Sequence, residues 1–284
     1  MRRVLVTGVR AKTGAPLADV LSARGDVHVR GGTRDPSGVD LANVQAVPFG
    51  WDDHDTWGSA LNGVDAVFVV RPDREDTPEL ISRFLRSSDP QLHVVLLSEV
   101  DGGYFGEEEW APRVERAVHE SGRTWTVLRP TWFMQVFSDS RFMLDDVVQR
   151  GVLAFPSAGQ SVSWIDARDI AAVAERALTE DGHQGRTYEL SGPEALSLPE
   201  TARQLAGALD RPVQHVEITL DEALEGTTGF ARQNDAGALE RVRLGMAGTV
   251  TQDVQAVTGR RARTFAEFLH EDAAFRPASE WRRG

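Results

Sequence analysis

In the first half of the chain, short apolar runs alternate with segments in which apolar residues recur at helical spacing. Near-continuous apolar runs are typical of strands buried on both faces of a parallel sheet. The pattern predicts such strands at residues 66–70 and 93–97, and further strands at 4–6, 27–29 and 124–128. Helices are expected between them, at residues 16–23, 56–61, 77–86 and 110–120. Repeated strand–helix units of this kind predict an α/β fold of the Rossmann type, with a doubly wound parallel sheet.

The pattern changes after about residue 150, where helical spacing dominates. Helices are expected at residues 166–178, 197–209, 220–224, 231–246 and 265–275, with a strand at 214–218. Ser197 and Glu200 form a capping-box signature at the start of the second of these helices. We therefore predict a nucleotide-binding domain over residues 1–150 and a smaller, mostly helical substrate-binding lobe over 151–284. A strand near 186–190 is expected to return to the sheet.

Composition narrows the classes of partner and the compartment. A net charge of −12 among 284 residues argues against nucleic acid or an anionic membrane as a partner. No apolar run approaches the length of a membrane span, and the absence of cysteine excludes thiolate chemistry and disulfides. The histidines lack the spacing of metal ligands, so no metal is expected. These features favour a cytoplasmic protein, monomeric or homodimeric, that acts on a small molecule.

The loop after the first predicted strand carries the strongest chemical signal. It runs from Gly8 through Arg10, Ala11, Lys12 and Thr13 to Gly14, directly before a predicted helix. In a Rossmann site, such a turn directs backbone N–H groups and a helix N-terminus at a pyrophosphate. Glycine serves where the backbone turns tightly or approaches the ligand closely. The spacing is Gly-x-x-Ala-x-x-Gly, with Ala11 where a glycine is usual; the loop is either a cofactor site or its degenerate remnant.

The residues after the second predicted strand indicate which dinucleotide binds. NAD enzymes usually place an acidic residue there for the ribose hydroxyls, whereas arginine suits the 2′-phosphate of NADP. Here Thr33 is followed by Arg34, and Arg10 offers a second positive charge. Bidentate contact between arginine and phosphate is the reason to expect NADP(H). The alternative is that both arginines are solvated surface residues.

Several segments, in order along nearly the whole chain, resemble one family. They comprise the loop Gly8–Gly14, Phe49 to Asp52, Gly63 to Phe68, the run from Trp125 to Gln135, Ile165 to Ala171, and Tyr188 to Ser197. On these segments the chain resembles the NmrA-like, atypical short-chain dehydrogenase/reductases. Within them it is most similar to a bacterial branch related to the ergot-alkaloid enzymes festuclavine and agroclavine dehydrogenase.

The resemblance implies an NADP(H) site with named residues. Gly8, Lys12, Thr13 and Gly14 would surround the pyrophosphate, and Arg34 the 2′-phosphate. The adenine would lie near Trp51 and Asp52, and the nicotinamide ribose between Arg71 and Ser98. The nicotinamide face would be lined by Pro130, Thr131, Trp132 and Phe133. This chain departs from the family at Val9, Arg10, Ala11 and Arg71, all of which lie in the expected cofactor cradle.

The catalytic groups are less defined. Short-chain dehydrogenases usually use a tyrosine with a lysine four residues later, which is impossible here because Lys12 is the only lysine. The candidates for an acid or a cation-attracting group are Tyr104, Glu99 and Asp101, each with surface exposure as the alternative. An aromatic and apolar substrate pocket is expected from Tyr104, Phe133, Met134, Phe137 and Trp164, with core packing as the alternative.

Three functions follow from these observations. The first is an NADPH-dependent reductase of an activated C=C or C=N bond in a small aromatic or polycyclic metabolite, in secondary metabolism. The second is a non-catalytic NADP-binding sensor or regulator, as in NmrA itself. The third is a cyclase or isomerase on the same fold that uses the cofactor structurally or not at all.

Overall fold

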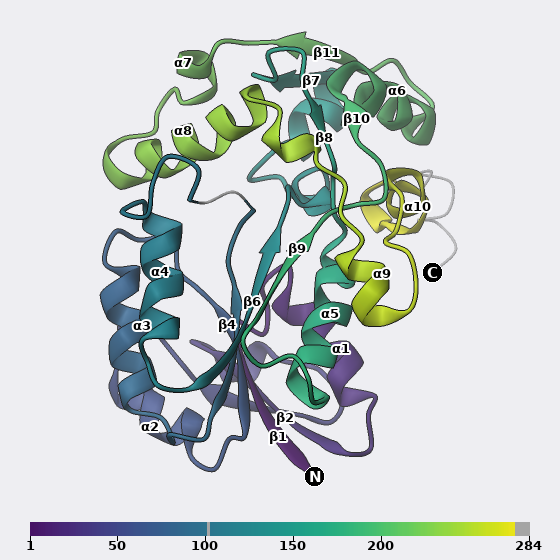
Figure 1. The fold of residues 1–284 in the computed structure, drawn as a ribbon. Coiled ribbons are helices and arrows are strands. Elements are labelled where there is room, and N and C mark those ends of the chain that lie inside the picture. Colours follow the sequence, from purple (N-terminus) through teal and green to yellow (C-terminus); the bar gives the residue numbers. More distant parts are fainter. Residues whose placement is uncertain (101–102, 276–284) are drawn as a thin grey trace. The chain divides into compact units, whose positions relative to one another are not determined.

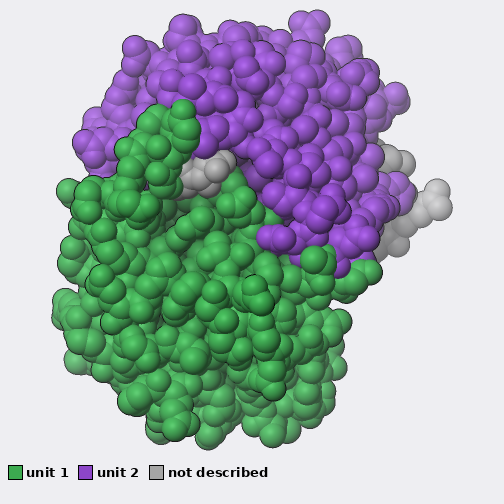
Figure 2. Space-filling model, viewed as in Figure 1, with its two compact units in different colours: residues 1–130, 167–189, 256–259 green, residues 131–166, 190–255, 260–284 purple. Residues whose placement is uncertain are grey.

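The computed structural model describes residues 1–100 and 103–275, and it divides the chain into two compact units (Figure 2). Unit 1 comprises residues 1–130, 167–189 and 256–259, and unit 2 comprises residues 131–166, 190–255 and 260–284. The chain therefore passes from one unit to the other five times. A single boundary near residue 150 does not describe this division, because later segments complete the layers of unit 1.

Unit 1 is built on one seven-stranded sheet with the strand order β3-β2-β1-β4-β5-β6-β9 (Figure 1). All the pairs between β3 and β6 are parallel. The strands are β1 (Arg2–Thr7), β2 (Val27–Thr33), β3 (Val44–Pro48), β4 (Ala66–Val70), β5 (His93–Leu97), β6 (Thr124–Pro130) and β9 (Arg186–Leu190). The order reverses direction between β1 and β4, which is where a doubly wound sheet opens a crevice for a ligand.

Helices cover both faces of this sheet. Figure 1 shows α3 and α4 on one side of the strands and α1 with α5 on the other. The helices of unit 1 are α1 (Gly14–Ser22), α2 (Asp55–Leu61), α3 (Thr77–Arg86), α4 (Trp110–His119) and α5 (Ala167–Thr179), with a 3₁₀ turn at Pro36–Gly38. In α3 the residues Leu80, Ile81, Phe84 and Leu85 are buried while Glu79 and Arg83 are exposed, the stripe expected of a helix on a sheet.

The central strands are buried on both faces, as their apolar runs predicted. All of β5 is buried, and Val67, Val69, Val94 and Leu96 join the core beneath α2, α3 and α4. Because the strands are parallel, the carboxyl ends of β1, β2, β4, β5 and β6 lie at one edge of the sheet. The loops that carry the predicted cofactor residues therefore leave the sheet at the same edge.

Unit 2 has two small two-stranded sheets around a separate apolar core. β7 (Val152–Phe155) pairs in parallel with β11 (Gln214–Glu217), and β8 (Ser161–Val162) pairs antiparallel with β10 (Leu196–Ser197). Its helices are α6 (Leu198–Leu209), α7 (Leu220–Ala223), α8 (Gly229–Arg243) and α10 (Phe265–Glu271). The short α9 (Asp253–Thr258) runs from unit 2 into unit 1. Short turns of 3₁₀ or π type occur at Met134–Val136, Asp146–Arg150, Met246–Gly248 and Ala273–Phe275.

The predicted fold class is confirmed: a Rossmann-type parallel sheet with a mostly helical second part. The expected capping box is half formed at the start of α6, where the Ser197 hydroxyl accepts the N–H of Glu200. Within the described residues, no helix is long and apolar enough to cross a membrane.

Candidate cofactor and substrate site

The loop between β1 and α1 makes a tight turn that requires glycine at both ends. Gly8 has a φ of +67°, in the left-handed region. A Cβ on Gly14 would lie 2.1 Å from the carbonyl oxygen of Gly8, so only glycine fits at this first residue of α1. In the first turn of α1, the Ala15 N–H donates to the Ala11 carbonyl and Pro16 has no N–H. The close-packed turn before the helix has the form of the strand-to-helix loop that binds the diphosphate of a dinucleotide.

Ala11 and Val9 are accommodated within this loop. The Ala11 N–H donates to the Gly8 carbonyl at 2.8 Å, and Ala11 has no positive φ that would demand glycine. The buried Val9 side chain occupies the space above Gly31 of β2, where a Cβ would lie 2.9 Å from Val9 Cγ2. The valine that departs from the family pattern is thus matched by a missing side chain on the neighbouring strand.

Two guanidinium groups are found near the carboxyl end of β2. The Arg10 side chain lies against the turn Pro36–Gly38, with Nη1 2.8 Å from where a Cβ on Gly38 would be. Arg34 follows β2 directly and is exposed, with its Cγ beside Gly50. Hydrogen bonds from the hydroxyl and the N–H of Ser37, with the charge of Arg10 nearby, hold the pKa of Asp35 below its usual value. Arg10 and Arg34 thus both lie near the end of β2, with the Asp35 carboxylate beside Arg10.

Trp51 and Asp52, expected near the adenine, follow the adjacent strand β3. Trp51 is half-buried in an aromatic group, with its ring centroid 5.1 Å from that of Phe49 and 5.3 Å from that of Phe84. Asp52 is exposed and forms an ion pair with Arg74. Both residues lie in the segment after β3, where Asp52 is engaged by Arg74, and their expected place near the adenine stays a prediction.

Arg71, which follows β4, is held from three sides. Its Nη2 donates to the Glu99 carboxylate at 2.7 Å, and its Nη1 to Asp73 at 3.1 Å. The guanidinium carbon lies 4.2 Å from the ring centroid of Trp110, a cation–π distance. The side chain is only 8% exposed, and its Nε has no hydrogen-bond partner among the described residues. Arg71 therefore faces Glu99, which we predicted as a catalytic candidate.

Ser98 participates in a buried network that the sequence did not reveal. Its hydroxyl donates to Glu115 of α4 at 2.5 Å, and Glu115 accepts two further bonds from the Arg129 guanidinium of β6, at 2.9 and 2.5 Å. Glu115 is buried. Its only signal in the sequence was its position on the apolar face of α4, next to Val114 and Val118. The network joins the ends of β5 and β6 to α4.

The remaining predicted catalytic residues lie on the loop after β5. Tyr104 is 57% exposed and stacks edge-on against Phe105, with ring centroids 4.9 Å apart. Asp101 lies outside the described residues.

The predicted pocket residues after β6 belong to unit 2. Met134, Phe137 and Trp164 are almost completely buried, and the Phe137 and Trp164 rings meet at 4.9 Å in the core of that unit. Core packing, the alternative reading, accounts for these three side chains. Trp132 and Phe133 retain exposed surface, and Thr131 donates its hydroxyl to the Ser163 carbonyl at 2.5 Å. Pro130 ends β6 and accepts the Val100 N–H at 3.0 Å.

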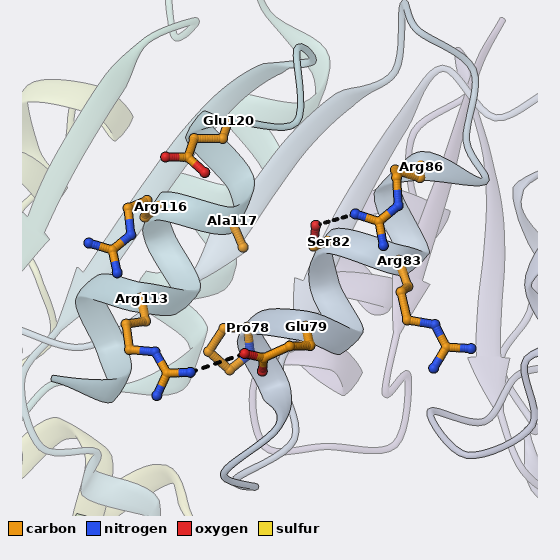
Figure 3. Close-up of a pocket in the computed structure, with 9 residues that line it drawn as sticks. All are labelled: Pro78, Glu79, Ser82, Arg83, Arg86, Arg113, Arg116, Ala117 and Glu120. Carbon is orange, nitrogen blue, oxygen red and sulfur yellow. Dashed lines mark hydrogen bonds and ion pairs between the residues drawn. The ribbon is translucent and has the colours of Figure 1, made fainter. Parts of the chain in front are cut away.

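A surface groove of about 490 Å³ lies between α3 and α4 (Figure 3). Four arginines, two glutamates and three small or apolar residues line it: Arg83, Arg86, Arg113, Arg116, Glu79, Glu120, Pro78, Ser82 and Ala117. Arg113 pairs with Glu79 at 3.1 Å, and Arg86 donates to the Ser82 hydroxyl at 2.7 Å. Exposed pairs of this kind contribute little to stability. None of the predicted site residues lines the groove, and no binding role follows from it.

Fold and loop geometry together define a Rossmann-type dinucleotide-binding protein. No protein-family model matches the chain. The chain is 35% identical to an NAD(P)H azoreductase of Xenophilus azovorans, over 77% of this chain and 79% of that protein. It is 33% identical to the (4-alkanoyl-5-oxo-2,5-dihydrofuran-3-yl)methyl phosphate reductase of Streptomyces griseus, over 96% of this chain and 99% of that protein. An agroclavine dehydrogenase of Claviceps fusiformis is 27% identical over 95% of this chain and 96% of that protein.

Solved structures share the fold. The Escherichia coli NADPH-dependent quinone oxidoreductase QOR2 in complex with NADPH superposes with a TM-score of 0.77 over 94% of this chain and 98% of that one, at 17% identity. NmrA, a negative transcriptional regulator in complex with NADP, superposes with a TM-score of 0.72 over 95% of this chain and 94% of that one, also at 17% identity. From the relatives and this fold, the chain belongs to the NmrA-like family of atypical short-chain dehydrogenase/reductases, as its motifs indicated.

Proposed function

We propose that this protein uses NADPH to reduce an activated C=C or C=N bond of a small aromatic or polycyclic metabolite, in a pathway of secondary metabolism. The enzyme class is the part of this prediction that the relatives bear out: it is an NADP(H)-dependent oxidoreductase, like the reductases and dehydrogenases to which it is similar. The preference for an activated double bond rests on the residues of this chain.

The observation that carries the cofactor proposal is the pairing of the Gly8–Gly14 turn with Arg10 and Arg34. The turn would receive the diphosphate on backbone N–H groups, and the two guanidinium groups would hold the 2′-phosphate. NADPH supplies a hydride when bound. The residues of this chain would bind and orient it, and the carboxyl edge of the sheet would present its reactive ring to a substrate.

The kind of substrate follows from the polar side chains near that edge. Lys12, the chain's only lysine, lies in the phosphate loop, so no tyrosine–lysine pair can protonate a ketone oxygen. Ser98 donates its hydroxyl to Glu115, and Glu99 accepts from Arg71. An acceptor that takes a hydride without a strong protein acid suits this arrangement. Iminium groups and double bonds conjugated to a carbonyl are of this type.

The cofactor proposal is tested by comparing NADPH with NADH in wild-type protein and in Arg34→Ala. We expect binding of NADPH in the wild type to weaken by about 10- to 100-fold in the variant, because a charge-assisted contact to phosphate contributes about 1.5–3 kcal/mol. NADH affinity should be unchanged. Arg86→Ala, in the groove between α3 and α4, is the matched control and should bind both nucleotides as the wild type does.

Turnover distinguishes the three functions. Oxidation of NADPH, followed by its absorbance, should be stimulated by an iminium or a conjugated carbonyl compound. Tight NADPH binding without turnover of any such acceptor would point to the sensor or regulator instead. Failure to bind either nucleotide would overturn both and leave the cyclase or isomerase.

A further inference from the structure

A charged cluster lies at the ends of β4 and β5 in unit 1, where the nicotinamide end of the cofactor is expected, and the carboxylates in it have no role in binding the cofactor. We call it the Arg71 cluster; it consists of Arg71, Asp73, Glu99 and Trp110. Its members come from the loop after β4, the loop after β5 and the first turn of α4. These elements end at the sheet edge where ligands bind in doubly wound folds.

The guanidinium of Arg71 is fixed within this cluster. Two of its nitrogens donate to carboxylates at 2.7 and 3.1 Å, and Trp110 covers its face at 4.2 Å. Trp110 is itself anchored, because its indole N–H donates to the Arg74 carbonyl at 2.7 Å. A planar guanidinium held in this way fixes the orientation of a carboxylate more precisely than the flexible ammonium group of a lysine would. Arg71 therefore acts on Glu99, whose side chain keeps 24% of its surface exposed.

The charges of the cluster do not cancel. Two carboxylates surround one guanidinium, so the cluster carries one net negative charge. At the other end of the same edge, Arg10 and Arg34 follow β1 and β2 with positive charge. Asp35 lies beside Arg10 at that end, whereas the Arg71 cluster holds two carboxylates against one guanidinium. An excess of carboxylate favours a cationic ligand in orientation as well as in affinity.

We propose that Glu99 is a specificity-determining residue that selects acceptors carrying a positive charge, and that Arg71 is its positioning residue. This inference rests on the proposed function and narrows its substrate class to cations such as iminium ions. The reaction balances without a protein acid: the cation gains the hydride with its electron pair and becomes neutral, while NADPH becomes NADP⁺. A fixed carboxylate stabilises the cation before that transfer.

Equilibrium binding tests the inference without turnover. The probes are N-methylquinolinium, a permanent cation, and quinoline, which has nearly the same shape and is neutral at pH 8. Calorimetric titration of the wild type, with and without NADP⁺, should show at least a tenfold preference for the cation. Glu99→Gln removes the charge at nearly constant shape and should reduce that preference about tenfold. Glu79→Gln, an exposed carboxylate on α3, should leave it unchanged.

Turnover provides the second measurement. With malachite green, a cationic dye, kcat/KM should fall about tenfold in Glu99→Gln, mainly through KM. The neutral quinone menadione should lose much less, so that the ratio of the two kcat/KM values falls, whereas Glu79→Gln should leave this ratio at its wild-type value. Arg71→Lys keeps the charge but not the planar guanidinium, and it should lower the ratio of cation to quinone turnover by a smaller factor.

Two results would overturn the inference. One is equal binding of the two probes by the wild type; the other is an equal cation preference in Glu99→Gln and Glu79→Gln. Failure of the chain to bind NADPH would defeat the proposed function alone, because the probe titration without nucleotide still measures the charge preference of Glu99.

Discussion

Gly14 shows how closely the phosphate loop is packed at the level of single atoms. Because a Cβ at this position would meet the Gly8 carbonyl oxygen at 2.1 Å, Gly14→Ala must push α1 away from the loop. We expect the substitution to lower the free energy of unfolding by about 3 kcal/mol, the upper range for overpacking, and to abolish tight NADPH binding. Chemical denaturation and nucleotide titration measure both effects.

Gly58→Ala is the matched control for this substitution. Gly58 lies in α2, and a Cβ there would meet nothing within 4 Å. Alanine is favoured over glycine in a helix by about 1 kcal/mol, so this variant should be slightly more stable than the wild type. If both variants have wild-type stability, the packing described for Gly14 does not exist in solution.

Val9 illustrates what the sequence alone could not show at this scale. The sequence showed that Val9 departs from the family pattern. It could not show that the valine side chain fills the space beside Gly31 on the next strand, which a side chain at Gly31 would otherwise occupy. Such compensation joins residues far apart in the chain. The glycines and arginines of the loop could be predicted because their roles follow from local backbone geometry and charge.

At the scale of the element, β5 contains a buried histidine that makes stability depend on pH. His93 is 3% exposed and lies within hydrogen-bond distance of the Thr124 and Thr126 hydroxyls. Burial, together with the charge of Arg2, lowers the pKa of His93 from 6.5 to about 4. Between these values the unfolded chain binds a proton that the folded chain does not. Stability is therefore lost as the pH falls below 6.5.

We expect this residue to account for a loss of about 2 kcal/mol in unfolding free energy between pH 7 and pH 5. Urea denaturation of the wild type and of His93→Gln at both pH values isolates the effect, because the other titrating groups are common to the two proteins. The variant should lose about 2 kcal/mol less than the wild type over this interval. Equal losses would mean that His93 takes up a proton in the folded state.

The elements that could be predicted are those with an unambiguous pattern. β4 and β5 are near-continuous apolar runs, β1 and β6 each contain a short apolar run, and α3 and α4 have clear apolar faces. β3 was missed because it is a short strand at the edge of the sheet, half-exposed and ending in proline, so its alternation is weak. The predicted helix over 231–246 ends at Arg243, because Gly245 has a φ of +81°.

At the scale of the whole molecule, the interleaving of the two units determines which fragments can fold. A fragment of residues 1–150 lacks α5 and β9. Residues such as Ile170, Val173 and Ala174 of α5 are fully buried against the sheet of unit 1, and β9 lies beside β6. We therefore expect this fragment to lack a cooperative thermal transition, because the face of the sheet that α1 and α5 cover together loses α5, and β6 loses its neighbouring strand.

A fragment of residues 1–190 serves as the control, since it restores both elements. It should show more ordered secondary structure by circular dichroism and greater resistance to proteolysis than the shorter one. A cooperative transition in the 1–150 fragment, at a temperature near that of the full chain, would refute the division of the chain described here.

Lys12 gives the phosphate loop a practical property. It is the one side-chain amine in the sequence, and it lies between the two glycines of the turn. Reagents that acylate amines scatter labels over the surface of most proteins, but among the side chains here they have a single target. Apart from the N-terminal amine, a fluorophore or an isotope attached in this way reaches only the loop, and its signal reports on a ligand that enters there.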